Sequence, residues 1–171
     1  MAIIHRELKE TKKEKAILNK LAALSADDID TFERLIKIAE EEKNWKAVAL
    51  NGQRYLSANP LNPRIYRSMA KAYQNLSSST DAIQVWKAIL QMDPADPAEA
   101  NFKLASLIAD SDPTQARQHL LRALEDAPRY RDAHRLLQKL SKQASISPQA
   151  KAAAAEPTAA PTPSPKRIQS K

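Results

Sequence analysis

Residues 62–94 read NPRIYRSMAKAYQNLSSSTDAIQVWKAILQMDP and contain two segments with helical periodicity, separated by a polar turn. The first segment places its large and small apolar side chains on one face of a helix, at Tyr66, Met69, Ala70 and Tyr73. The second segment does the same at Ala82, Ile83, Trp86, Ile89 and Leu90. Thr80 is predicted to cap the second helix, and Pro94 ends the unit because proline disfavours helix in the residue before it.

This pattern resembles the tetratricopeptide repeat (TPR), a helix–turn–helix unit of about 34 residues. The residues that carry the resemblance are Tyr66, Met69, Ala70, Tyr73, Ala82, Trp86 and Pro94. Ala70 stands where the family usually has glycine, and both are small enough for two helices to approach closely. The resemblance implies an all-α fold, an α-solenoid of about three TPR helix-turn-helix repeats with an N-terminal helix and a C-terminal capping helix.

Prolines recur at a constant interval, at Pro60, Pro94 and Pro128, each 34 residues from the next. This interval predicts a repeat on each side of residues 62–94, with helices at about 29–43 and 45–59 in the first. Gly52 lies inside the second of these helices and indicates a close helix–helix approach. Helices at about 4–24 and 129–142 are predicted to cover the two ends of the stack. For the N-terminal helix, a partner-binding role and a remnant of a longer chain stay open as alternatives.

Composition divides the chain into three parts: a charged N-terminal helix at 1–25, a repeat domain at 26–142, and a tail at 143–171. The net charge of +7 comes from the flanks, because the region 26–140 holds equal numbers of basic and acidic residues. The tail is rich in Ala and Pro and is predicted to be disordered. No signal peptide and no transmembrane segment is recognisable, so a cytoplasmic location is the default expectation.

The residue inventory argues against catalysis. There is no cysteine and a single glycine, which excludes a thiolate metal site and a glycine-rich phosphate loop. The three histidines have no partner at metal-ligand spacing, and no serine has a recognisable base. We therefore predict a non-enzymatic protein without cofactor or metal, and without specific nucleic-acid binding.

In stacked helix pairs the first helix of each pair lines a concave groove. Helical geometry places five basic side chains beside the core face there: Arg34, Lys37, Arg64, Arg67 and Lys71. They predict a strip that accepts an acidic peptide or a C-terminal carboxylate. The alternative is ordinary solvated charge, because Glu33 and Glu40 lie nearby. The groove asparagines of TPR domains that clamp chaperone C-termini are missing, so that activity is not inferred.

Residues 93–140 are also similar to the C-terminal repeat region of large bacterial proteins built around a gluzincin-type metallopeptidase domain. The matching blocks are Asp96–Ala100, Leu121–Glu125 and Ala127–Ala133. This resemblance implies an accessory module without the catalytic domain. The leading hypothesis is a scaffold that binds a protein or peptide partner, and a weak nucleic-acid binder acting through the basic flanks is a further alternative.

Overall fold

The computed structural model describes residues 10–25, 27–92 and 94–153. Within these ranges the chain forms eight α-helices and no strand, which confirms the predicted all-α class. The helices are α2 (Thr11–Leu24), α3 (Ile29–Glu41), α4 (Trp45–Ala58), α5 (Pro63–Asn75), α6 (Ser79–Gln91), α7 (Pro97–Ile108), α8 (Pro113–Asp126) and α9 (Arg131–Ala153).

The helix starts form two interleaved series with a 34-residue period. Helices α3, α5, α7 and α9 begin 34 residues apart, and so do α2, α4, α6 and α8. We call the first series A-type helices and the second B-type helices. The period indicated by the prolines is therefore confirmed, and it extends to the helices at both ends of the chain.

Side-chain caps fix most of these starts. An Asp or Asn side chain accepts a backbone N–H at the start of five helices, and the capping residues are Asp28, Asn44, Asn62, Asp96 and Asp112. Hydrogen bonds from the Thr31 hydroxyl and from its backbone N–H lower the pKa of Asp28. Proline occupies the first turn of α5, α7 and α8, where its missing N–H leaves no bond unmade.

The start of α6 differs from the sequence-based expectation. Thr80 was predicted to cap this helix, but the cap position belongs to Ser78, and Thr80 already lies inside the first turn. The backbone turns back at Ser77, which has a φ of 57°, and the Ser78 N–H then donates to the Tyr73 carbonyl. The Ser78 hydroxyl donates to Asp81 at 2.5 Å, so the prediction about Thr80 was wrong by two residues in a run of similar polar side chains.

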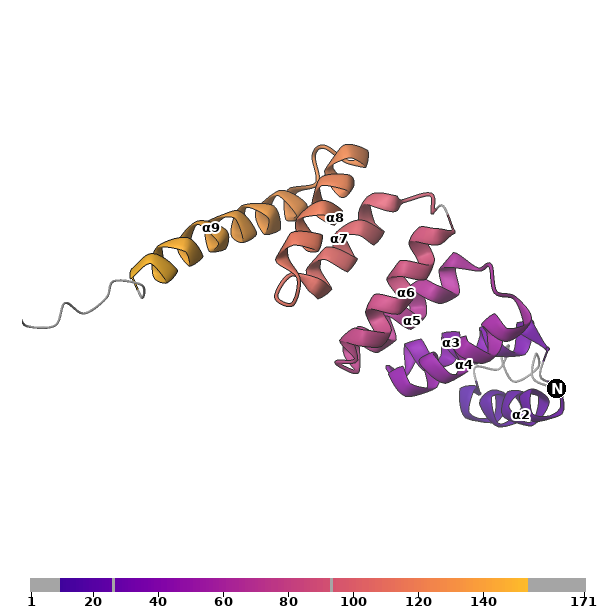
Figure 1. The fold of residues 1–171 in the computed structure, drawn as a ribbon. Coiled ribbons are helices and arrows are strands. Elements are labelled where there is room, and N and C mark those ends of the chain that lie inside the picture. Colours follow the sequence, from indigo (N-terminus) through magenta and orange to yellow (C-terminus); the bar gives the residue numbers. More distant parts are fainter. Residues whose placement is uncertain (1–9, 26, 93, 154–171) are drawn as a thin grey trace, which may run out of the picture.

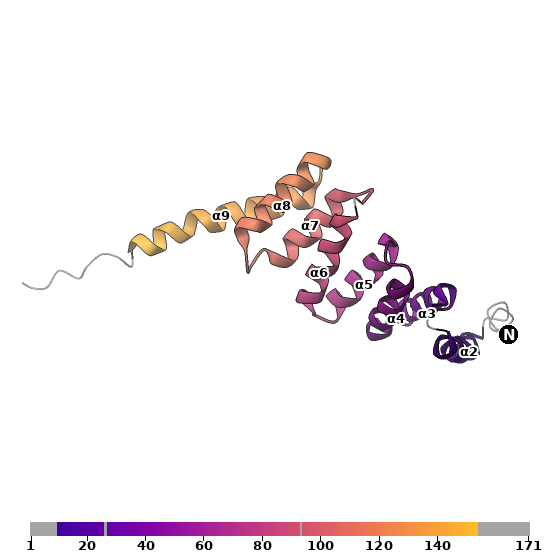
Figure 2. The same ribbon diagram turned by 45° about the vertical axis from the view of Figure 1, so that its right-hand side comes forward.

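The helices stack in chain order, and each packs mainly against the helix before and after it. Figures 1 and 2 both show this succession running from α2 to α9. Ala70 and Ala82 are fully buried where α5 and α6 cross, and Trp86 is 3% exposed, as the sequence predicted for small crossing residues and a core tryptophan. One continuous core therefore runs through the stack.

Gly52 confirms the predicted close approach. A Cβ atom at this position would lie 2.5 Å from Met69 Cγ and 2.7 Å from Met69 Sδ. Helices α4 and α5 thus meet with a methionine side chain directly against the glycine. Any side chain at residue 52 requires Met69 to move.

The two end helices cover the stack in different ways. Helix α2 packs on α3, where Leu18, Leu35 and Ile38 form a small cluster apart from the main core. The part of the predicted N-terminal helix before Glu10 lies outside the described residues. At the other end, α9 packs on α8 and continues to Ala153, beyond the predicted end at residue 142. The predicted disorder of the tail therefore stays a prediction for residues 154–171, which lie outside the described residues.

A half-buried histidine joins α7 and α8. His119 Nδ1 lies 2.9 Å from Asn101 Oδ1, while Asn101 Nδ2 donates to the Pro97 carbonyl. Burial lowers the pKa of His119, and the positive charges of Arg122 and Lys87 lower it further. The folded state therefore favours the neutral imidazole of His119. Its contribution to the free energy of unfolding is fully present above the pKa of a histidine in the unfolded chain, about 6.5. This contribution is lost as the pH falls through the lower pKa that His119 has in the folded state.

We expect His119→Gln to reduce the loss of stability between about pH 7 and pH 5, because the variant has no imidazole to protonate. Thermal unfolding followed by circular dichroism at both pH values measures this difference. His134→Gln, at an exposed histidine of α9, is the matched control. Equal pH sensitivity of the wild type and His119→Gln would contradict the prediction.

Candidate partner-binding face

The A-type helices α3, α5 and α7 are linked across one face by ion pairs. Arg64 Nη1 lies 2.8 Å from Glu33 Oε1, which joins α5 to α3. Arg67 Nε lies 3.5 Å from Glu99 Oε2, which joins α5 to α7. Two predicted site residues therefore stand side by side on α5, each with a carboxylate of a different neighbour.

The Arg64 side chain is 63% exposed and the Arg67 side chain is 36% exposed, so both are partly accessible from solvent, although Arg67 Nε itself is buried and makes no hydrogen bond. Exposed ion pairs of this kind contribute about 0–1 kcal/mol and are exchanged at little cost. An incoming carboxylate can therefore replace Glu33 or Glu99 as the partner of an arginine. The bidentate geometry of guanidinium groups suits such a ligand.

The two lysines of the predicted strip lie on α3 and α5. Lys71 is exposed on α5, with its Nζ 5.5 Å from the centre of the Trp45 ring, a cation–π distance. Lys37 is exposed on α3, one repeat earlier at the equivalent position. Trp45, at the start of α4, is half-buried, and its ring lies against the Lys71 ammonium group. The exposed part of the indole is a further surface that a partner can contact beside this positive charge.

Arg34 lies apart from these four residues. Its Nε and Nη2 atoms donate to the two carboxylate oxygens of Glu14 in α2, at 2.6 and 2.7 Å. The Glu14 side chain is 1% exposed and the Arg34 side chain 17%. Hydrogen bonding to Glu14 raises the pKa of Arg34 above its usual value. This guanidinium joins α2 to α3, and its Nε and Nη2 atoms are already engaged by Glu14.

An aromatic pair extends the face toward the C-terminal end. The ring centres of Phe102 in α7 and Tyr130, just before α9, lie 4.8 Å apart. Burial raises the pKa of Tyr130, and the carboxylates of Glu99, Asp132 and Asp96 raise it further. A shallow pocket of about 490 Å³ adjoins it, lined by Ala127 to Tyr130. Phe102 also packs against the main core, and sequence reasoning missed its pairing with Tyr130, a residue that lies 28 positions later in the chain.

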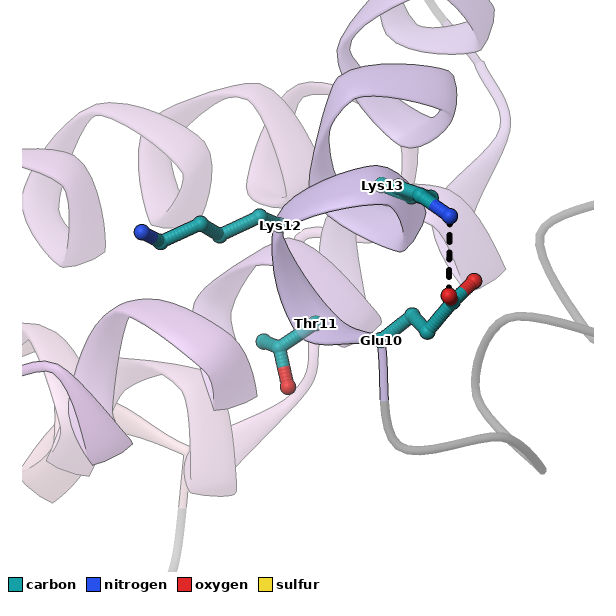
Figure 3. A pocket seen from close by; sticks show the side chains of 4 residues that line it. All are labelled: Glu10, Thr11, Lys12 and Lys13. Atoms are coloured by element: carbon teal, nitrogen blue, oxygen red, sulfur yellow. Dashed lines mark hydrogen bonds and ion pairs between the residues drawn. The ribbon is translucent and has the colours of Figure 1, made fainter.

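A second shallow pocket lies at the start of α2, away from these residues. It has a volume of about 350 Å³ and is lined by Glu10, Thr11, Lys12 and Lys13. Lys13 Nζ pairs with Glu10 Oε1 at 2.8 Å, while Lys12 extends away from this pair (Figure 3).

Within residues 10–153, apart from the two undescribed positions, no group of three or more His, Cys, Asp or Glu side chains could hold a metal ion. No helix in the same part of the chain is long and apolar enough to cross a bilayer. The chemistry available on the candidate face is therefore ion pairing, hydrogen bonding and aromatic contact.

No protein-family model and no curated protein sequence matches this chain. Solved structures do match its fold. YrrB, described as a TPR protein with an unusual peptide-binding site, superimposes with a TM-score of 0.68 at 14% identity, covering 84% of this chain and 74% of that one. MamA superimposes with a TM-score of 0.62 at 10% identity, covering 87% and 97% of the two chains.

The fold is a TPR-like α-solenoid.

The first TPR of Spaghetti (RPAP3), solved with the HSP90 peptide SRMEEVD, matches with a TM-score of 0.60 at 16% identity. That match covers 71% of this chain and 96% of the other. At these identities the likeness establishes the fold, and the TPR-like stack explains the geometry described above. Ion pairs from α5 reach both α3 and α7, so side chains of these three helices share one surface.

Proposed function

We propose that this TPR-like chain is a non-catalytic scaffold that binds a protein or peptide partner on the face formed by α3, α5 and α7. The observation that carries the proposal is the row of cations on this face, whose carboxylate partners among the described residues, Glu33 and Glu99, are partly exposed to solvent. Its members are Lys37, Arg64, Arg67 and Lys71, with Trp45 beneath Lys71. Peptide binding by the similar folds of YrrB and RPAP3 supports this use of the surface.

The chemistry of the row favours an acidic segment. A peptide carboxylate next to Arg67 or Arg64 would replace Glu99 or Glu33, and Lys71 and Lys37 would add two further positive charges. Apolar side chains of the same peptide could contact Trp45, or Phe102 and Tyr130 further along the face. Arg34 is left out of the proposed contact set because its side chain is mostly buried and Glu14 already accepts from its Nε and Nη2 atoms.

We expect Arg67→Glu and Lys71→Glu each to weaken binding of an acidic peptide by roughly 10- to 100-fold, since each removes a charge-assisted contact worth about 1.5–3 kcal/mol. An array of acidic peptides with free carboxyl termini, SRMEEVD among them, supplies the probe. Fluorescence anisotropy of the best binder then compares the variants with the wild type. Glu99→Gln is expected to strengthen binding severalfold, because it removes the competitor for Arg67.

Arg54→Glu is the matched control, because Arg54 is exposed on the B-type helix α4. Circular dichroism verifies that each variant is folded. The proposal fails if no acidic peptide binds better than its Gln- and Asn-substituted counterpart. It also fails if Arg54→Glu weakens binding as much as Lys71→Glu does.

The other readings of the sequence stay predictions. The comparisons give no support to a link with gluzincin-type metallopeptidases. The basic tail, in which a nucleic-acid role would reside, lies outside the described residues from 154 on.

A further inference from the structure

Helix α2 occupies an incomplete place in the repeat series. It is a B-type helix by its start at Thr11, 34 residues before α4. Helices α4, α6 and α8 each lie between two A-type helices, whereas α2 packs on α3 alone among the described helices. One side of α2 is therefore not covered by the stack.

Residues at equivalent repeat positions show which side chain of α2 is exposed as a result. Tyr55, Ile89 and Ala123 occupy one position in α4, α6 and α8 and are 3%, 0% and 0% exposed. The corresponding residue of α2, Leu21, is 39% exposed. Repeat geometry thus assigns this position to the core, and in α2 a large apolar side chain there reaches solvent.

Leu21 belongs to a longer apolar stripe. Ile17, Leu21 and Leu24 are spaced by four and three residues, which places them on one side of α2. Leu24 is 85% exposed. The opposite side of the apolar face, with Glu14 and Leu18, is the one buried against α3. We call Ile17, Leu21 and Leu24 the α2 stripe.

Among the described residues, the C-terminal end of the stack in a second copy offers no apolar surface that could cover the α2 stripe. Helix α9 is an A-type helix, and the residues that correspond there to the buried Leu104, Ala105 and Ile108 of α7 are polar. These residues are Gln138, Lys139 and Lys142, and all three are exposed. A head-to-tail chain in which α9 of one copy covers α2 of the next would bury two lysines against leucine side chains, which is unfavourable.

The charges around the stripe favour a two-fold arrangement instead. Lys13, 65% exposed and paired with Glu10 of its own copy, lies before the stripe, and the exposed Asp27 and Asp30 follow it. In an antiparallel pair of α2 helices with Ile17 of one copy opposite Leu21 of the other, Lys13 of each copy lies opposite Ser25 of its mate, two residues before Asp27, and can exchange Glu10 for that carboxylate. The same surface is then complementary to itself, as a closed two-fold dimer requires.

We propose that this chain self-associates through the α2 stripe, as an antiparallel pair of α2 helices related by a two-fold axis. A 14-residue helix offers only about 21 Å of length for this contact. The buried surface is therefore below the roughly 1,200 Å² typical of stable complexes, and the dimer is weak and reversible. The peptide-binding face of α3, α5 and α7 is distinct from the stripe, so the two proposals fail independently.

Sedimentation of the full chain over a wide concentration range tests the association. The expected mass rises from 19.0 kDa toward twice that value, and Leu21→Glu holds it at the monomer. Because the chain has no cysteine, an equimolar mixture of Leu21→Cys and Ile17→Cys should give a covalent dimer under mild oxidation, since these two positions face each other in the proposed pair. Leu121→Cys, at a leucine that is 52% exposed on α8, is the matched control and should give much less.

A charge swap tests the antiparallel geometry. Lys13→Asp and Asp27→Lys should each abolish the dimer, because each places like charges together at both ends of the pair. An equimolar mixture of the two variants should restore it, since Lys13 then meets Asp27 at one end and the two substituted residues pair at the other. Failure of the mixture to associate would overturn the geometry.

The proposal as a whole is overturned if the wild type stays monomeric at every concentration. It is also overturned if Leu121→Cys cross-links as readily as the mixture of Leu21→Cys and Ile17→Cys. A third outcome also overturns it: the full-length chain stays monomeric, while a chain lacking residues 1–9 dimerises. Residues 1–9, and not a second copy, would then cover the α2 stripe.

Discussion

Replacing Glu14 by Gln is expected to lower the free energy of unfolding by about 3 kcal/mol. The carboxylate of Glu14 is almost completely buried and accepts two hydrogen bonds from Arg34. Removing its charge leaves a largely buried guanidinium without its counter-ion, which is the costly way to break such a pair. Helix α2 is otherwise attached by a small cluster around Leu18 and by an exposed ion pair, so this buried pair is a large part of its attachment. Urea unfolding followed by circular dichroism measures the change.

The exposed ion pair between Lys15 and Glu42, which joins the same two helices, provides the control. Lys15→Ala is expected to change stability by less than about 1 kcal/mol. The double variant Glu14→Leu/Arg34→Met is expected to recover most of the loss, because two apolar side chains can replace a buried pair. A Glu14→Gln effect no larger than that of Lys15→Ala would contradict the assignment.

Gly52→Leu is expected to destabilise the chain by about 2–3 kcal/mol, although leucine or tryptophan occupies the equivalent place in three other helices. Those residues are Leu18, Trp86 and Leu120, all of them buried. At residue 52 the space is taken by Met69, which a Cβ atom would already approach to 2.5 Å. A substitution chosen from the repeat pattern alone would therefore fail here.

A second substitution at Met69 should restore the stability that Gly52→Leu removes. Met69→Ala alone should cost about 2 kcal/mol or more through the cavity that it leaves. Combined with Gly52→Leu, it exchanges a large side chain on α5 for one on α4, and most of the stability should return. Thermal unfolding of both single variants and the double variant gives a coupling energy, expected to be about 2 kcal/mol. Additive effects would show that Gly52 and Met69 are not in contact as described. Leu50→Ala, exposed on the same helix, should change stability by no more than about 0.5 kcal/mol.

The fold could be predicted from the sequence because its determinants are local. Helical periodicity, Asx residues at helix starts and prolines at a 34-residue interval each act within a few residues of where they stand. Gly52 could also be interpreted correctly, since a glycine inside a helix usually marks a close contact. The start of α6 could not be located to the residue, because Ser77, Ser78, Ser79 and Thr80 are all similarly suited to cap a helix.

The candidate face was harder to predict, because its properties depend on partners far along the chain. Arg34 and Arg64 look alike in the sequence, yet one is bonded to a buried carboxylate and the other to an exposed one. The partner of Arg34 is twenty residues earlier, on a helix whose packing no local pattern specifies. Likewise, Phe102 pairs with Tyr130 across 28 residues of sequence, a contact that no local pattern specifies.

The stacking of each helix on its sequence neighbours also bears on how the chain reaches its native state. No remote segments have to meet before a helix pair becomes stable, so little loop-closure entropy opposes the early steps, and rapid folding follows. Loss of structure should begin where a helix has one neighbour only. Amide hydrogen exchange is then slowest in α5 and α6 and quickens toward both termini.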